Sequence, residues 1–213
     1  MKKFWAQQPD TARSPHDRMS VYPQNRIVPL LKRIILPPSY RIIPSKYEIT
    51  PLDTNPANSR FCTNNSNFSI LYAASDFSTA FIEVVIRDRF TQIDQCKIHL
   101  SELTERSYVR IISTPNSNLI FLDLPQDGCT RLGAPTDAVN ATSHSAGREL
   151  GHEIYSNHSE VDGLLFSSRL TGNDIYAIFD RAISKLSVIE LKKTIDNQEL
   201  TTILARYSIQ LIT

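Results

Sequence analysis

The chain has 213 residues, of which 41% are hydrophobic and 21% charged, a length that suits one globular domain with a sizeable buried core. Its 23 basic residues nearly balance its 22 acidic ones, and a net charge of +1 argues against a protein that coats nucleic acid. No apolar run approaches the roughly 18 residues of a membrane span.

The amino-terminal part is predicted to be an extension of the main domain. Residues 1–25 are polar and rich in proline, whereas 26–36 are mostly apolar. We therefore expect a loose beginning and an apolar end that packs on the domain. This divides the chain into an extension over 1–36 and a domain over 37–213.

The first half of the domain is predicted to contain two strands, a loop and a helix. β-branched and aromatic residues predict strands over 40–43 and 69–74, and the polar stretch 50–67 between them predicts a loop. Asp76 is placed to cap a helix over 78–88. The apolar stripe of that helix is predicted to contain Ala80, Phe81, Val84 and Val85.

The second half mixes strands and helices without a regular alternation. A helix is predicted over 145–156, and the tail after residue 196 predicts a short helix and a closing strand over 206–212. Further strands are predicted over 95–100, 109–113, 119–124, 163–168 and 174–179. This irregular order favours an α+β fold with mixed strands and flanking helices.

Several familiar signatures are absent. There is no glycine-rich dinucleotide or phosphate-binding motif, and three cysteines without a C-x-x-C pair predict no disulfide framework. No secretory signal is indicated, so we expect a cytoplasmic location. His152-Glu153 begins like a zinc helix but lacks the second histidine, and the spacing of His144, His152 and His158 fits no common helical face. We therefore expect surface histidines and no metal.

Five polar residues interrupt segments that are otherwise apolar. Arg41 lies inside a predicted strand, Arg60 ends the loop, Tyr72 lies in the second strand, Glu83 lies in the predicted helix and Ser168 ends a later strand. A carboxylate in an apolar turn is costly to bury without a cationic or hydrogen-bonding partner. Taken singly, each residue also fits an ordinary structural role, such as a solvated helix position for Glu83 or a core position for Tyr72.

Their combination resembles the RES-domain family, which is named for its Arg, Glu and Ser. The resemblance covers roughly residues 37–190. It rests on Tyr40-Arg41, Arg60-Phe61, Leu71-Tyr72-Ala73-Ala74, Ala80-x-x-Glu83, Asp162-Gly163-Leu-Leu-Phe-x-Ser168-Arg169 and Ile178-Phe179-Asp180-Arg181.

The resemblance implies a single domain similar to ADP-ribosyltransferases, acting as the toxin of a bacterial toxin–antitoxin pair. Members act on NAD⁺ as a substrate, so no separate cofactor is implied. The family triad corresponds to Arg60, Glu83 and Ser168, and its supporting pocket residues to Arg41 and Tyr72. The implied partner is a cognate antitoxin protein, with a homo-oligomer left open.

These residue types suit cleavage of the nicotinamide–ribose bond, which passes through an oxocarbenium-like sugar. Glu83 would stabilise that charge. Arg41 and Arg60 would bind the pyrophosphate with their planar guanidinium groups. Tyr72 would stack on the nicotinamide, and Ser168 would bind its carboxamide or orient the acceptor. An arginine-rich pocket would also admit inorganic phosphate, which favours an NAD⁺ phosphorylase over a glycohydrolase that uses water.

Two departures from the family pattern leave alternatives open. Phe61 and Phe166 stand where many members have Trp or Tyr, and the extension over 1–36 has no counterpart. One alternative is a protein ADP-ribosyltransferase that modifies a metabolic enzyme. The other is an inactive RES-like domain that binds a nucleotide or a partner. The acceptor, the antitoxin and the preference between NAD⁺ and NADP⁺ are not decided by the sequence.

Overall fold

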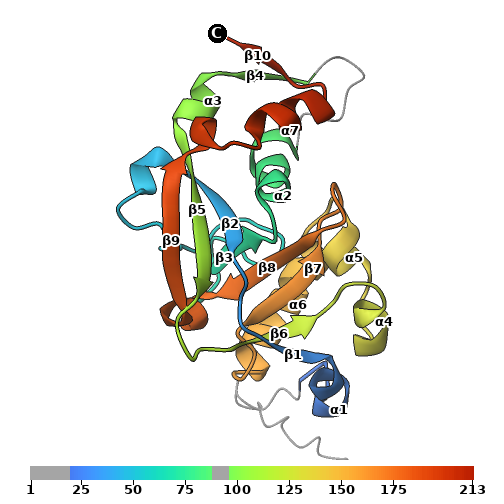
Figure 1. Ribbon diagram of the computed structural model, residues 1–213. Helices are drawn as coiled ribbons and strands as arrows, with labels where there is room; N and C mark the ends of the chain where they lie inside the picture. The colour runs from blue at the N-terminus through green and yellow to red at the C-terminus, as the bar shows by residue number, and fades with distance from the viewer. Residues whose placement is uncertain (1–19, 88–95) are drawn as a thin grey trace, which may run out of the picture.

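The computed structural model describes residues 20–87 and 96–213 and places most of them around one strongly twisted sheet (Figure 1). Eight strands form this sheet in the order β1-β6-β7-β8-β3-β2-β5-β9. Their bounds are β1 Leu31–Ile34, β2 Ser39–Pro44, β3 Ile70–Ala74, β5 Arg106–Ser113, β6 Leu119–Asp123, β7 Gly163–Ser167, β8 Asp174–Phe179 and β9 Leu186–Lys193. All neighbours are antiparallel except β6 and β7, so the predicted α+β class is confirmed.

Helices cover the sheet and fill one end of the molecule. Strands β4 (Lys97–His99) and β10 (Gln210–Ile212) pair in parallel at that end, beside α7 (Figure 1). The helices are α1 Gln24–Ile27, α2 Phe77–Phe81, α3 Ser101–Thr104, α4 Gly128–Leu132, α5 Asp137–Asn140, α6 Ser145–Asn157 and α7 Leu200–Arg206. Within the described ranges, no helix is long and apolar enough to span a membrane.

Most of the predicted elements are present. The helix predicted over 145–156 is α6, and five predicted strands match β2, β3, β6, β7 and β8 to within one residue at each end. Strand β5 starts three residues earlier than predicted. Of the strand predicted over 95–100, residues 97–99 form β4, and residue 95 lies outside the described ranges.

The predicted closing strand over 206–212 is too long. Helix α7 continues through Arg206, and a left-handed turn at Ser208 (φ 52°) separates it from β10. Strands β1 and β9, at the two edges of the sheet, were not predicted.

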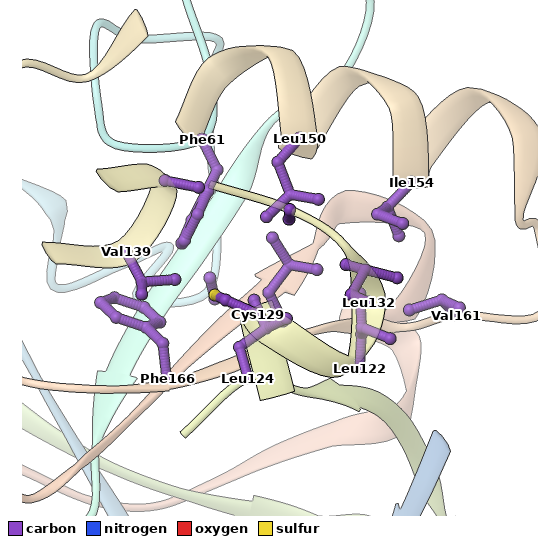
Figure 2. Close-up of a cluster of buried hydrophobic side chains, with 14 of the residues drawn as sticks. Phe61, Leu122, Leu124, Cys129, Leu132, Val139, Leu150, Ile154, Val161 and Phe166 are labelled. Atoms are coloured by element: carbon purple, nitrogen blue, oxygen red, sulfur yellow. The ribbon is translucent and has the colours of Figure 1, made fainter. Parts of the chain in front are cut away.

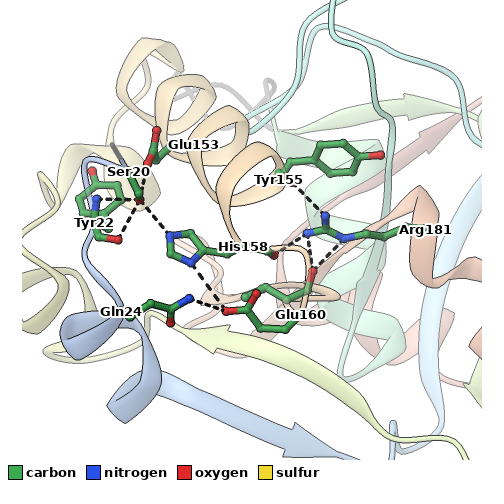
Figure 3. A network of polar contacts seen from close by, with 9 residues as sticks. Ser20, Tyr22, Gln24, Glu153, Tyr155, His158, Glu160 and Arg181 are labelled. Atoms are coloured by element: carbon green, nitrogen blue, oxygen red, sulfur yellow. Dashed lines mark hydrogen bonds and ion pairs between the residues drawn. The ribbon is translucent and has the colours of Figure 1, made fainter. Parts of the chain in front are cut away.

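The apolar end of the extension packs on the domain, as predicted. Strand β1 pairs with β6, and Ile27 and Leu30 are buried in the largest core cluster. Ser20 is held on α6, because its hydroxyl donates to Glu153 Oε1 at 2.6 Å (Figure 3). The loose beginning was predicted for the polar stretch 1–25, of which residues 1–19 lie outside the described part. Residues 20–25 are ordered, since Ser20 is held by Glu153 and Gln24 begins α1. The domain boundary at residue 37 stays a prediction.

The prediction of surface histidines is wrong for His158. His152 is exposed, but His158 is 1% exposed. Its Nε2 lies 3.0 Å from Ser20 Oγ, and its Nδ1 lies 3.7 Å from Glu160 (Figure 3). The extension covers this ring, which sequence spacing within α6 does not reveal.

The largest core cluster fills the space between α6 and the sheet (Figure 2). Phe61 and Phe166 meet edge to face there, with ring centroids 5.1 Å apart. Phe61 is fully buried and is therefore a core residue instead of a stacking platform for a ligand. Cys129 is also buried in this cluster, and burial raises the pKa of its thiol, so it is a core residue.

The sheet curls, so that one of its faces packs against itself. A second core cluster takes side chains from strands in both halves of the sheet, among them Ile43, Leu71, Val109 and Leu165. The halves meet between β2 and β3, which pair only at Tyr40 and Ala74. Beyond that pair the two strands separate, and this separation makes room for a cleft.

Candidate active site

A two-lobed cleft opens where β2 and β3 separate. The large lobe has a volume of about 490 Å³ and is lined by β2, β3 and the loop between them. The small lobe, of about 260 Å³, extends to the beginning of α6. Four residues line both lobes and form the boundary between them: Tyr72, Glu83, Val84 and Ile175.

Glu83 reaches this boundary through an irregular helix. Asp76 caps α2 as predicted, since its Oδ1 accepts from the Thr79 amide at 2.8 Å. Instead of continuing as a regular helix, residues Ile82–Ile86 form a π-helical turn. Helix α2 begins one residue before the predicted start at 78, and the predicted end at 88 lies outside the described ranges.

The π turn corrects the predicted apolar stripe at one position. Ala80, Phe81 and Val85 are buried as expected, but Val84 is 48% exposed. The wider turn rotates Val84 out of the stripe, so that Val84 lines the cleft together with Glu83. Such turns often occur at functional sites.

Ser168 fixes one oxygen of the Glu83 carboxylate. Its hydroxyl donates to Glu83 Oε1 at 2.6 Å and accepts from the amides of Leu170 and Thr171 at 3.1 and 3.2 Å. Ser168 is 3% exposed and lines neither lobe. With its donor and both acceptor sites used, this hydroxyl positions Glu83 and is not free to bind a substrate. Within the described part of the chain, Glu83 Oε2 has no hydrogen-bond partner.

Tyr72 forms a fixed wall between the lobes. Its hydroxyl oxygen accepts from the Phe61 amide at 3.3 Å and lies 3.1 Å from Ser59 Oγ. Burial is the main cause that raises its pKa, to about 12, so the phenol is neutral at physiological pH. The side chain also links β3 to the loop that carries Arg60.

Arg60 lies beneath α6 and lines the small lobe. Its guanidinium donates to the Ala141 carbonyl at 3.1 Å, and only 8% of the residue is exposed. Gly147 allows this approach, because a Cβ there would lie 2.5 Å from the Arg60 carbonyl oxygen. Burial lowers the pKa of Arg60, Arg169 and Arg87 lower it further, and Glu83 opposes them.

Arg41 lines the large lobe. Its Nη2 donates to the Asp53 carbonyl at 3.2 Å, which ties β2 to the loop after it. Burial lowers the pKa of Arg41 to about 10, so the guanidinium remains charged at physiological pH.

The structure therefore brings four of the five predicted residues to one cleft and places the fifth directly behind Glu83. Tyr72 and Glu83 line both lobes. The two arginines line different lobes, Arg41 the large one and Arg60 the small one.

Three further cleft residues were missed: Arg87, His144 and Arg169. Arg87 Nη2 lies 3.0 Å from His144 Nε2. A guanidinium only donates, so Nε2 accepts and this imidazole is neutral. Burial lowers the pKa of His144, and four arginines lower it further. Arg169 follows Ser168 directly in the sequence, which was the one available signal.

The donor set of the cleft suits anions better than metal ions. Within residues 20–87 and 96–213, no group of three or more His, Cys, Asp or Glu side chains is arranged to hold a metal. The small lobe instead presents three arginines around one carboxylate, that of Glu83.

Comparison with known proteins identifies the family. The RES-domain model matches residues 38–201, and the chain therefore belongs to the RES-domain family. It is 34% identical over 116 residues to the probable toxin y4kH of Sinorhizobium fredii, a match that covers 54% of this chain and 90% of that protein.

The fold is similar to that of a solved toxin. A chain in the M. tuberculosis MbcT–MbcA toxin–antitoxin complex superimposes with a TM-score of 0.60, at 16% sequence identity. The match covers 79% of this chain and 90% of the other. At this identity the likeness establishes the fold, and it confirms the predicted RES-type α+β domain.

Proposed function

We propose that this chain is the toxin of a toxin–antitoxin pair and that it degrades NAD⁺ by cleaving the nicotinamide–ribose bond. Membership of the RES-domain family supports this proposal, together with the similarity to the probable toxin y4kH and to a chain of the MbcT–MbcA complex.

The arrangement of Glu83 carries the proposal. Its carboxylate lies at the boundary of two lobes, with Oε1 held by Ser168 and Oε2 without a partner among the described residues. A carboxylate fixed in this way stabilises a developing oxocarbenium ion without first having to reorganise. The partner-free oxygen is available for a ribose hydroxyl. In this proposal Ser168 is a positioning residue.

The two lobes suit a bent dinucleotide. A volume of about 490 Å³ for the large lobe is in the range of small-molecule sites. Arg41 on one side and Arg60 on the other supply permanent positive charge for phosphate groups. The Tyr72 ring between them offers a surface for the nicotinamide or the ribose.

In the proposed reaction, the bond between C1 of the ribose and the nicotinamide nitrogen breaks, and its electron pair leaves with neutral nicotinamide. An oxygen of inorganic phosphate, HPO₄²⁻, bonds to C1 and releases one proton to solvent, which yields ADP-ribose 1-phosphate. Water in place of phosphate yields ADP-ribose. A protein side chain in that place would make the chain an ADP-ribosyltransferase.

The proposed antitoxin would act on the same cleft. The arginines of the cleft favour an inhibitor segment with carboxylate groups. Such a segment would neutralise the arginines and block entry of NAD⁺.

The test is NAD⁺ consumption by the purified chain with and without phosphate, with products identified by mass. We expect NAD⁺ loss that Glu83→Gln slows by about 100-fold or more, while the matched control Glu105→Gln, at an exposed position, leaves the rate unchanged. Undiminished consumption by folded Glu83→Gln would remove Glu83 from the mechanism. No NAD⁺ loss would contradict the proposal, and labelled ADP-ribose on a protein would favour the transferase. If neither NAD⁺ loss nor labelling of a protein is detected, the result would favour an inactive binding domain.

A further inference from the structure

The small lobe collects more positive charge than cleavage of the glycosidic bond requires. Arg60, Arg87 and Arg169 line it together with His144. Arg148 lies close enough to lower the pKa of the same histidine. Among the described residues, Arg60 donates to a carbonyl oxygen and Arg87 to the imidazole of His144, whereas Arg169 has no acceptor.

This charge is not neutralised by carboxylates. Within the described residues, none of the three lining arginines forms an ion pair. Glu83 is the one carboxylate that lines the small lobe, and Ser168 already holds its Oε1. Arg60 is buried, and buried cations in folded proteins are normally paired. Its unpaired charge, together with those of half-buried Arg87 and exposed Arg169, makes this lobe suited to an anion.

Two features hold the arginines in place. His144 accepts a hydrogen bond from Arg87, and the Ala141 carbonyl accepts one from Arg60. His144 is also the residue at the beginning of α6, a helix of 13 residues, and the positive end of a helix dipole adds to the potential there.

We propose that the small lobe is an oxyanion subsite that binds a phosphate group beside Glu83. Arg60, Arg87 and Arg169 donate to the phosphate oxygens, and His144 is a positioning residue for Arg87. The subsite deepens the proposed function and depends on it for the source of the phosphate. That source is either inorganic phosphate, the acceptor in phosphorolysis, or the pyrophosphate of the dinucleotide itself.

The primary test is direct binding of inorganic phosphate, measured by calorimetry without NAD⁺. We expect saturable binding to the wild-type chain and at least about tenfold weaker binding to Arg87→Gln and Arg169→Gln, since each removes a charge-assisted hydrogen bond. Arg33→Gln is the matched control, because Arg33 is exposed on β1 and lines neither lobe. Arg169 is exposed too, so its replacement preserves the fold even if Arg87→Gln does not.

A second arm tests the role of His144. His144→Ala should weaken phosphate binding, and His144→Gln, which retains an acceptor for Arg87, should restore most of it. Equal weakening by both variants would overturn the positioning role.

A third arm identifies the source of the phosphate. Phosphate that still binds when ADP-ribose saturates the protein identifies the acceptor site, whereas phosphate displaced by ADP-ribose identifies the site of the pyrophosphate. Binding that depends on Arg87 in a protein that consumes no NAD⁺ would support the subsite and contradict the proposed function. The absence of saturable binding, or affinities unchanged by Arg87→Gln and Arg169→Gln, would overturn the subsite.

Discussion

Buried Arg60 and half-buried Arg181 have opposite surroundings. Burial lowers the pKa of each guanidinium. Arg181 donates to the carbonyl oxygens of Tyr155, His158 and Val161 at distances between 2.6 and 3.0 Å (Figure 3). Nearby acidic groups also raise its pKa, whereas the neighbours of Arg60 that act most strongly are two other arginines, which lower it further.

These surroundings give Arg181 a structural role and leave Arg60 able to bind a ligand. The fold itself satisfies Arg181, which ties the end of α6 to the segment after β8. Arg60 has one carbonyl partner and lines a cavity. The two residues therefore predict opposite responses to mutation, one in stability and the other in activity.

The largest expected effect is on stability, in Arg181→Gln. The substitution leaves the carbonyl groups of Tyr155, His158 and Val161 without a full set of donors, and we expect the free energy of unfolding to fall by about 3 kcal/mol. Chemical denaturation measures this loss. The NAD⁺ cleavage rate per folded molecule should stay within about twofold of wild type, since Arg181 lines neither lobe. A stable but inactive Arg181→Gln variant would break the comparison.

Arg60→Gln should show the reverse. We expect kcat/KM for NAD⁺ to fall by about 100-fold, because a charge-assisted contact to phosphate is lost inside a low-dielectric cleft. The free energy of unfolding should change by less than about 1 kcal/mol, since the lost bond to Ala141 is offset by relief of repulsion from Arg87 and Arg169. A large loss of stability with normal kcat/KM would assign Arg60 to the fold.

Ser168→Ala is expected to have a smaller effect. It removes the hydroxyl that fixes Glu83 Oε1 but no substrate contact, so we expect kcat to fall about tenfold while KM for NAD⁺ changes little. Ser168→Thr keeps a hydroxyl and serves as the conservative variant. A rise in KM without a change in kcat would instead place the Ser168 hydroxyl in contact with the substrate.

The sequence was sufficient for most of the strands in the middle of the sheet and for the residues that belong to the family motifs. Arg41, Tyr72 and Glu83 interrupt apolar segments, and a polar residue inside such a segment is visible without a structure. The continuous apolar runs of β7 and β8 were also clear. The edge strand β9 was missed because it is mostly half-buried and ends in two lysines, which weakens the alternation.

The small lobe could not be predicted in the same way. His144 and Arg87 are 57 positions apart, and only the packing of α6 against the loop at Arg60 brings them together. The apolar spacing over 78–88 predicts a regular α-helix and does not indicate the π turn that places Glu83 and Val84 in the cleft. The spacing of residues along the sequence does not report tertiary contacts. Such contacts bring these residues together and also bury His158.

The smallest expected effect concerns the pH dependence of stability through His144. Burial and the nearby Arg60, Arg87, Arg148 and Arg169 lower its pKa in the folded state, so the unfolded chain binds a proton more readily. The contribution to stability is therefore complete above the unfolded pKa and is lost as the pH falls below it. Between about pH 7.5 and about pH 5.5, the wild type should lose more free energy of unfolding than His144→Gln, which cannot be protonated there. Chemical denaturation at the two pH values measures this difference. The carboxylates with lowered pKa values titrate below this pH range and do not contribute to it: Glu48, Glu153, Glu160 and Glu190. Identical losses in both proteins would mean that the arginines do not act on His144 and that the small lobe is less positive than its composition indicates.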